Sequence, residues 1–465
     1  MNEPVAARSE SSGYGLRRAV LSPFETLAQS VSTIAPATTP AATIPLVCAL
    51  AGNGTWLAYV LAMLAILLVA LCVSQFAKYS ASPGSLYSFT AKILPPVASA
   101  TSGWSLLLAY VMTGASVIGG FYHYANLLLH DARGRGASSV LLVLVCAGIS
   151  VWIAWRDIKI SARLMLWIEA VSLSLIMTLV VLVLVRTGFH LDVAQLELRG
   201  MSGSGLRLGL VLALFSFCGF ESATTLGSEA RNPLKTIPRA VIQSALLAGL
   251  IFVLCSYVEV VGFRTVGQDL GSNQAPMRVL AGLDGFPMLG VLIDIGVLVS
   301  MFAGTLGCVT AAARVLLLMA HDGLAPERLR GTHRIHETPG LAIVVTGIAA
   351  TAPVIVLAAR GASGLDVYGW MGSLATYGFI VAYALMSLAL PGYLRQHGAF
   401  SRGKQALSGI ACLAMLLALI GNLYPVPEGP YGKLPYIYLG YLLTGLLLFL
   451  WRRRNRQPAL ADAAE

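Results

Sequence analysis

Few acidic residues interrupt the long apolar runs of this sequence, and the most informative of them is Glu221. Only thirteen uncharged residues separate Arg207 from Glu221, and as a helix they would extend about 20 Å. Because the hydrocarbon core of a bilayer is about 30 Å thick, a membrane span here must carry Glu221 inside the membrane. A carboxyl group at that depth is costly and typical of ion or proton chemistry. Asp294, within another apolar run, is a second candidate for proton coupling or gating.

The residues around two positions predict interrupted helices. In the segment 217–220 (Phe-Cys-Gly-Phe) a glycine stands beside Glu221, where a helix can unwind. The segment 32–40 (Ser-Thr-Ile-Ala-Pro-Ala-Thr-Thr-Pro) places two prolines near the middle of an apolar run, and each removes a backbone donor. Paired interruptions of this kind are typical of binding sites near the membrane midplane. The alternative is a proline kink in the first run and a packing glycine in the second.

Membrane-crossing helices must position these residues. The 465 residues are 57% hydrophobic and 11% charged, against about 45–50% and about 25% in soluble domains, which excludes an ordinary soluble protein. Runs of about 20 apolar residues predict twelve spans. They lie at about 24–50, 55–77, 98–128, 137–155, 164–186, 206–230, 238–262, 287–318, 339–359, 367–394, 406–424 and 434–451.

The charges lie mainly between these spans and orient the chain. Most of the 31 Lys and Arg fall in alternate connections, which predicts that both termini are cytosolic and accounts for the net charge of +10 without a nucleic-acid partner. We expect a cytosolic tail at 1–20, a core at 21–394, two further helices at 395–452 and a second tail at 453–465. Because the two interruptions are five spans apart, the core is predicted to hold inverted repeats at about 21–190 and 200–394.

Three motifs then resemble those of the amino acid–polyamine–organocation (APC) superfamily. Residues 215–239 (FSFCGFESATTLGSEARNPLKTIPR) resemble its sixth-helix signature, which reads approximately G-F-E, then N-P and I-P-R. Residues 82–87 (SPGSLY) are similar to its P-G-G-x-Y element, and residues 314–326 (RVLLLMAHDGLAP) to its R-x-x-x-x-M-A-R-D-G-x-x-P element. The resemblance implies the leucine-transporter-like fold: an all-α membrane protein of about twelve helices, a five-plus-five inverted repeat with helices 1 and 6 broken, and two C-terminal helices.

The resemblance also implies a site. In the family, the substrate carboxylate meets backbone amides of helix 1, and its amine meets carbonyls freed in helix 6. By position, the substrate-binding residues would be Ser32, Thr33, Ile34, Ala35, Pro36, Ala37 and Thr38 in helix 1, and Phe215, Ser216, Phe217, Cys218 and Gly219 in helix 6. Phe215 falls where related exchangers have a Trp that closes over the substrate, and Glu221 matches a carboxylate implicated in proton sensing.

Each of these roles has an alternative. Phe215 is either an aromatic lid or a packing residue, Glu221 either a proton site or a cap of the inner half-helix, and Asp294 either a coupling residue or a structural hydrogen-bond acceptor. Glu169 and Glu259 are expected to snorkel or cap near helix ends. From helices 3 and 8, Tyr110, Thr113 and Cys308 are guesses for the pocket lining.

Two departures from the family pattern widen the choice of substrate and coupling ion. Ile34-Ala35-Pro36 replaces the usual G-S-G break, and because proline has no N–H, fewer amides remain for a carboxylate. A decarboxylated amine or another small polar solute therefore stays open. Residues 164–185 contain no Lys or Arg to stand in for a sodium ion, which leaves proton coupling, sodium coupling or exchange.

The motifs of rival classes are absent from the sequence. It has no G-x-x-x-x-G-K-[ST] phosphate loop and neither H-E-x-x-H nor G-x-S-x-G, so we expect neither a primary pump nor an intramembrane enzyme. We expect no catalytic residue, metal site or cofactor. The predicted function is a secondary transporter of an amino acid or related amine in the cell membrane, proton-coupled or exchanging. The partners are the small-molecule substrate, membrane lipid and a coupling ion. A cation or polar-solute transporter or channel on the same scaffold, or a non-transporting sensor, is the alternative.

Overall fold

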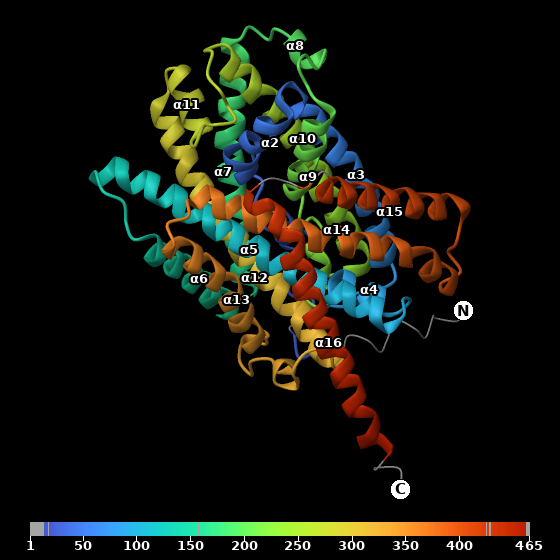
Figure 1. Cartoon of the computed structure of the whole chain (residues 1–465). Helices are drawn as coiled ribbons and strands as arrows, with labels where there is room; N and C mark the ends of the chain where they lie inside the picture. Colours follow the sequence, from blue (N-terminus) through green and yellow to red (C-terminus); the bar gives the residue numbers. More distant parts are fainter. Residues whose placement is uncertain (1–13, 17, 157, 425, 427–428, 462–465) are drawn as a thin grey trace.

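The computed structural model describes residues 14–16, 18–156, 158–424, 426 and 429–461, which form a bundle of helices (Figure 1). The helices are α1 (Pro23–Ile34), α2 (Ile44–Ala51), α3 (Thr55–Ala77), α4 (Ser85–Ala91), α5 (Pro96–Arg133), α6 (Ser139–Arg156), α7 (Ile158–Arg186), α8 (Val193–Leu196), α9 (Gly203–Phe215), α10 (Pro233–Arg264), α11 (Pro276–Leu283), α12 (Pro287–His321), α13 (Gly340–Ala359), α14 (Gly364–Gln396), α15 (Arg402–Leu423) and α16 (Leu434–Ala461). A π-helical turn, η2 (Thr39–Thr43), and a 3-10 turn, η4 (Ser222–Leu226), complete the elements used below. Helix α16 continues past residue 452, where the sequence predicted its end.

Among the described residues, ten helical segments are long and apolar enough to cross a membrane. One of them is a 55-residue path, Pro23–Ala77, which contains two of the predicted spans, and α9 is a shorter apolar helix. The outward-facing side chains are apolar, as contact with lipid requires. On α15, for example, Leu413, Leu417 and Ile420 recur at helical spacing and are each more than half exposed. The all-helical membrane fold class is therefore confirmed.

The centre of the bundle is built by α5, α12 and α14. The most apolar stretch of α5 is 83% buried, whereas that of the segment Gly429–Arg453 is only 22% buried. Helix α5 is therefore central in the bundle, and α16 is peripheral. Small residues allow the close contact: a Cβ on Gly378 of α14 would lie 2.4 Å from the carbonyl oxygen of Ser105 in α5. Close backbone approach at small residues is how membrane helices gain packing energy without a hydrophobic driving force.

The bundle has two ends, which we name by the short helices found there. The α8 face carries the connections at 51–54, 187–202 and 265–286, and the α4 face carries those at 78–95 and 322–339 (Figure 1). On the α4 face the chain before α1 pairs with the chain that follows η4. Leu21 N–H donates to the Glu229 carbonyl and Arg231 N–H to the Leu21 carbonyl, both at 2.9 Å.

A buried ion pair holds this same region to α12. Arg314 Nε and Nη2 donate to the two carboxylate oxygens of Glu229 at 2.7 and 2.8 Å, and Nη1 donates to the Thr310 carbonyl at 3.1 Å. The side chains are 2% and 0% exposed. In the sequence Arg314 begins the 314–326 motif, and Glu229 lies within the 215–239 motif without an expected role. The structure instead makes the two a bidentate pair, the geometry in which Arg and a carboxylate satisfy each other best.

Removing one partner of this pair should be far more costly than removing both. We expect Arg314→Met or Glu229→Gln to lower the free energy of unfolding by about 3–5 kcal/mol, because each leaves a buried charge unpaired. The double variant should recover part of that loss. Thermal unfolding of the detergent-purified protein measures both effects, and a double variant no more stable than the single ones would contradict this account of the pair.

Candidate functional site

The first interruption lies between α1 and η2. Helix α1 begins at a capping box in which Ser22 and Glu25 bond each other's backbone N–H, and it ends at Ile34. Ala35 takes left-handed angles (φ 48°), and Pro36 follows without a donor, so the α-helical ladder cannot continue. The backbone resumes as the π turn η2 and then as α2. The interruption thus falls at the position that the prolines predict.

The second interruption follows α9. That helix ends at Phe215, residues 216–221 form turns, and Gly219 has φ +97°, a conformation that side chains rarely adopt. A Cβ on Gly219 would lie 2.4 Å from Thr33 Cγ2, so the two interrupted segments are in direct contact. Glycine is therefore required here both by the backbone angle and by the closeness of α1.

Hydroxyl groups join the two interrupted segments. Ser222 Oγ donates to Thr33 Oγ1 at 2.9 Å, and Ser30 Oγ accepts from the Ala223 backbone N–H at 2.9 Å. Helix α12 contacts the first segment as well, because Ser32 Oγ donates to the Ala303 carbonyl at 2.9 Å. The bond to the Ala223 N–H pairs a backbone donor of the second interruption, as the water-free interior of a membrane requires, and the other two hold the segments against each other and against α12.

Glu221 lies at the centre of this arrangement and is fully buried. Tyr110 of α5 donates to its Oε1 and Tyr383 of α14 to its Oε2, each at 2.6 Å. The carboxyl group thus connects the unwound segment to two of the central helices, α5 and α14. Two phenol donors fix its orientation and stabilise its charged form.

Phe215 closes against another aromatic ring. Its ring centroid is 5.7 Å from that of Tyr368 in α14, in an edge-to-face arrangement, and Gly372 leaves the space that the ring occupies. Tyr368 Oη lies 2.8 Å from Thr43 Oγ1 in the π turn. This aromatic pair therefore spans from α9 to α14 directly beside both interruptions.

The other helix 6 residues predicted to bind substrate have partners elsewhere. Ser216 Oγ lies 3.2 Å from Tyr59 Oη of α3, and Phe217 packs edge-on against Phe252 of α10 at 5.2 Å. Cys218 Sγ donates to the Leu214 carbonyl at 3.7 Å, within its own turn.

The remaining helix 1 residues are buried at the interruption. Thr38 Oγ1 donates to the Ala35 carbonyl at 2.7 Å, and Ile34, Ala35 and Ala37 are 6% exposed or less. Pro36 lines a small apolar gap with Ile34.

Asp294 has a different partner from the interrupted helices. It is 1% exposed and accepts from Arg278 of α11, whose Nε lies 2.6 Å from Oδ2, and Arg278 also pairs with Asp131 at the end of α5. Its contacts with Arg278 therefore join α12 to α11 at the α8 face. From the sequence, Asp294 was either a coupling residue or a structural hydrogen-bond acceptor.

The expectation that Glu169 and Glu259 snorkel is wrong. Both side chains are buried, at 2% and 1% exposed, and Glu169 accepts from Ser300 of α12 at 2.7 Å. They lie inside the bundle because α7 and α10 each pack against several neighbouring helices.

Several residues of this arrangement were not found by sequence reasoning. Tyr110 was one of three guesses, whereas Tyr383, Tyr368, Ser30 and Ser222 were missed. The small polar run that follows Glu221 was a usable signal for Ser222. The tyrosines carry no local signal, because only the packing of α14 brings them to Glu221 and Phe215.

The chain matches a known protein family over most of its length. Residues 27–424 match the family model described as amino acid permease. The chain belongs to the amino acid permease family. Relatives of this permease include the branched-chain amino acid permease BcaP of Bacillus subtilis, 25% identical over 428 residues and covering 87% of each chain. Another is the low-affinity putrescine importer PlaP of Escherichia coli K12, 25% identical over 351 residues and covering 72% of each.

A solved structure supports the fold. A manganese transporter mutant of Eremococcus coleocola matches with a TM-score of 0.58 at 14% identity, covering 94% of both chains. This likeness shows the fold alone. Together with the apolar helices, the family places this permease in the cell membrane as a multi-pass protein of the APC superfamily.

Gly219 offers a sharp test of the contact between the interrupted segments. We expect Gly219→Ala to destabilise the permease by about 1–3 kcal/mol, because the methyl group meets Thr33 and the left-handed backbone is strained. Gly148→Ala on α6 is the matched control, since a Cβ there meets nothing within 4 Å. Thermal unfolding of both variants measures the difference, and equal stability would show that the contact at Gly219 is not tight.

Proposed function

We propose that this chain is a secondary active transporter that moves an amino acid or a related amine across the cell membrane by alternating access. The observation that carries the proposal is the direct contact of two interrupted helices beside the buried carboxyl group of Glu221. Segments of this kind expose backbone amides and carbonyls that recognise an anionic and a cationic group of a solute.

The proposed site lies between the helix 1 segment 32–38 and the helix 6 segment 215–219. Amides of the first segment would meet an anionic group, and carbonyls of the second an ammonium group. Phe215, paired with Tyr368, would close the site toward the α8 face. Glu221 would carry the coupling proton, since a carboxyl group held between two phenols can exchange a proton without leaving its place.

The proposed topology has twelve crossings. In it α1–α2 and α9–η4 form the two broken helices of a five-plus-five inverted repeat, followed by α15 and α16. The α4 face and both termini would be cytosolic, because the basic residues favour that side. The broken helices would then move against a scaffold of α5, α6, α12 and α13.

A second candidate is transport of a small polar solute that lacks a carboxylate. Pro36 favours it, because the first interruption has one amide fewer to offer an anion. The names of the relatives include both kinds of substrate: one relative is named for branched-chain amino acids, which carry a carboxylate, and another for putrescine, which carries none. A channel or a sensor on the same scaffold would differ in kinetics, since a channel does not saturate and a sensor binds without uptake.

Uptake into proteoliposomes tests the function. L-leucine, L-arginine and putrescine should be compared with and without a proton or sodium gradient. We expect saturable uptake of at least one of them, and a loss of about tenfold or more in proton-driven uptake in Glu221→Gln, equivalent to about 1.4 kcal/mol. Glu197→Gln is the control, since Glu197 is exposed and pairs with Arg199 on the α8 face.

Two outcomes would count against the proposal. Binding of a solute without any uptake would replace the transporter by a sensor. Glu221→Gln with wild-type uptake and pH dependence would remove Glu221 from the coupling mechanism while leaving the transport function in place.

A further inference from the structure

Glu259 is a buried carboxyl group that the site described above does not use. It lies on α10, five residues before that helix ends at Arg264, and it is 1% exposed. No atom of the described residues forms a hydrogen bond with either of its carboxylate oxygens. This arrangement is unusual, because buried polar groups in proteins are nearly always paired.

The other buried glutamates of the spans provide the comparison. Glu221 accepts from two phenols and Glu169 from Ser300. Donors of this kind stabilise a carboxylate, and Glu259 has none. A charged carboxylate that is buried without a partner costs several kcal/mol, whereas the neutral acid avoids most of that cost. The buried surroundings of Glu259 therefore favour its neutral, protonated form.

The groups that face Glu259 do not supply a countercharge. Four neutral side chains lie close enough to interact with it electrostatically. They are Tyr59 of α3, Tyr124 of α5, Cys48 of α2 and Cys255 of α10. Tyr124 already donates to the Ala41 carbonyl in the π turn, so its hydrogen is engaged. The surroundings are thus aromatic, sulfur-containing and uncharged.

The cations of the neighbouring elements are paired with other acids. Arg186 of α7 lies near Gly262 but pairs with Asp284 at 2.6 Å, and Arg278 of α11 pairs with Asp294 and Asp131.

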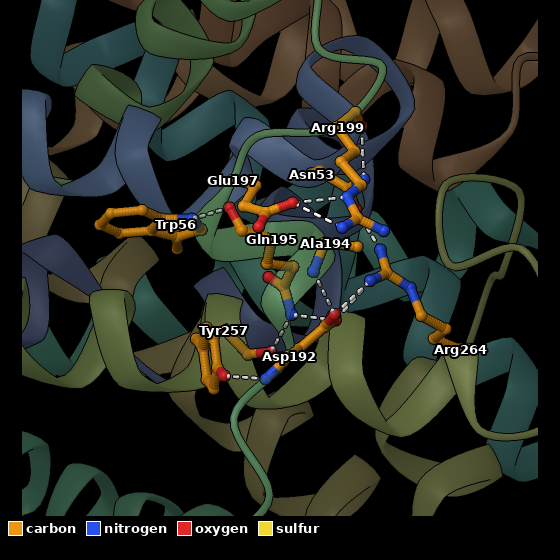
Figure 2. Close-up of polar contacts among 9 residues, drawn as sticks. All are labelled: Asn53, Trp56, Asp192, Ala194, Gln195, Glu197, Arg199, Tyr257 and Arg264. Atoms are coloured by element: carbon orange, nitrogen blue, oxygen red, sulfur yellow. Dashed lines mark hydrogen bonds and ion pairs between the residues drawn. The ribbon is translucent and has the colours of Figure 1, made fainter.

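Arg264, the nearest cation on α10, is likewise directed to other partners. Its Nη1 donates to both oxygens of Asp192 at 2.5 Å, and its Nη2 donates to Asn53. Figure 2 shows the guanidinium group turned toward these two residues.

These contacts belong to a cluster that covers the end of α10. We call Asn53, Asp192, Gln195, Tyr257 and Arg264 the α10 cap (Figure 2). Asp192 N–H donates to Tyr257 Oη at 2.7 Å, and Gln195 Nε2 donates to Asp192 Oδ2 at 3.0 Å and to the Tyr257 carbonyl at 3.2 Å. Asn53 follows α2, the second arm of the interrupted first helix, so a movement of that arm would act directly on the cap.

We propose that Glu259 is a proton-carrying site of this transporter, which holds its proton while the α10 cap is closed and releases it to water at the α8 face when the cap opens. The O–H bond of the acid breaks, the proton passes to water, and the carboxylate is stabilised by hydration until it is protonated again. No other reactant is needed. The inference rests on the proposed transport function for its role, but the protonation of Glu259 can be tested without transport.

Carbodiimide labelling tests the protonation. Dicyclohexylcarbodiimide reacts with protonated carboxyl groups in apolar surroundings, and mass spectrometry locates the product. We expect labelling of Glu259 in the purified protein at pH 7 and none at the exposed Glu197. Absence of label at Glu259, in protein that becomes labelled there once it is acidified, would show a charged carboxylate and overturn the proposal.

Transport by Glu259→Gln tests the role. We expect proton-driven accumulation to fall about tenfold or more, while exchange of the same solute at equal pH on both sides changes by less than about twofold, since a neutral amide mimics the protonated acid. Glu197→Gln is the matched control. Glu259→Gln with unchanged proton-driven accumulation, or accumulation driven by sodium alone in the wild type, would overturn the proposal.

The two proposals fail separately. If wild-type protein takes up none of L-leucine, L-arginine and putrescine, the transport function in its stated form is wrong, and labelling still decides whether Glu259 is protonated. If the wild type transports and Glu259→Gln behaves identically, only the role of Glu259 is wrong.

Discussion

The absence of water from the bilayer interior is the constraint on which this architecture depends. Every backbone group that an interrupted helix releases must find a partner inside the protein, so an interruption can exist only where neighbouring elements are built to receive it. The Ser30 hydroxyl meets that requirement at the Ala223 N–H, and side-chain bonds between Ser222 and Thr33 and from two phenols to Glu221 satisfy the polar side chains beside it. Polar side chains from several elements therefore meet at the two interruptions.

The positions of the interruptions could be predicted from the sequence because their causes are local. Pro36 removes a donor, Gly219 permits a left-handed backbone, and the short distance from Arg207 places Glu221 within the membrane. The partners could not be predicted in the same way. Tyr383 and Tyr368 reach the site only through the packing of α14 against α5 and α9, a long-range arrangement that leaves no trace in the spacing of their own helix.

The acidic residues show the limit of the same reasoning. A carboxyl group near the end of an apolar run is expected to extend toward the headgroups, and Glu169 and Glu259 would do so on an isolated helix. In the bundle, neighbouring helices enclose both side chains. The buried glutamates, Glu229 included, differ in the group that stabilises each carboxylate. Glu229 accepts a bidentate arginine, Glu169 a hydroxyl donor, and Glu259 neither. Depth in the membrane can be predicted from sequence, whereas the electrostatic surroundings at that depth depend on the fold.

Leu21 pairs with the chain around Ala230 through backbone hydrogen bonds. Backbone hydrogen bonds of this kind do not depend on the side chain that each residue carries. The link nevertheless joins the chain that enters the first helix to the chain that leaves the second interruption. The order of the chain before α1 is therefore coupled to that of the chain after η4, because melting of either one would leave backbone groups of the other without partners.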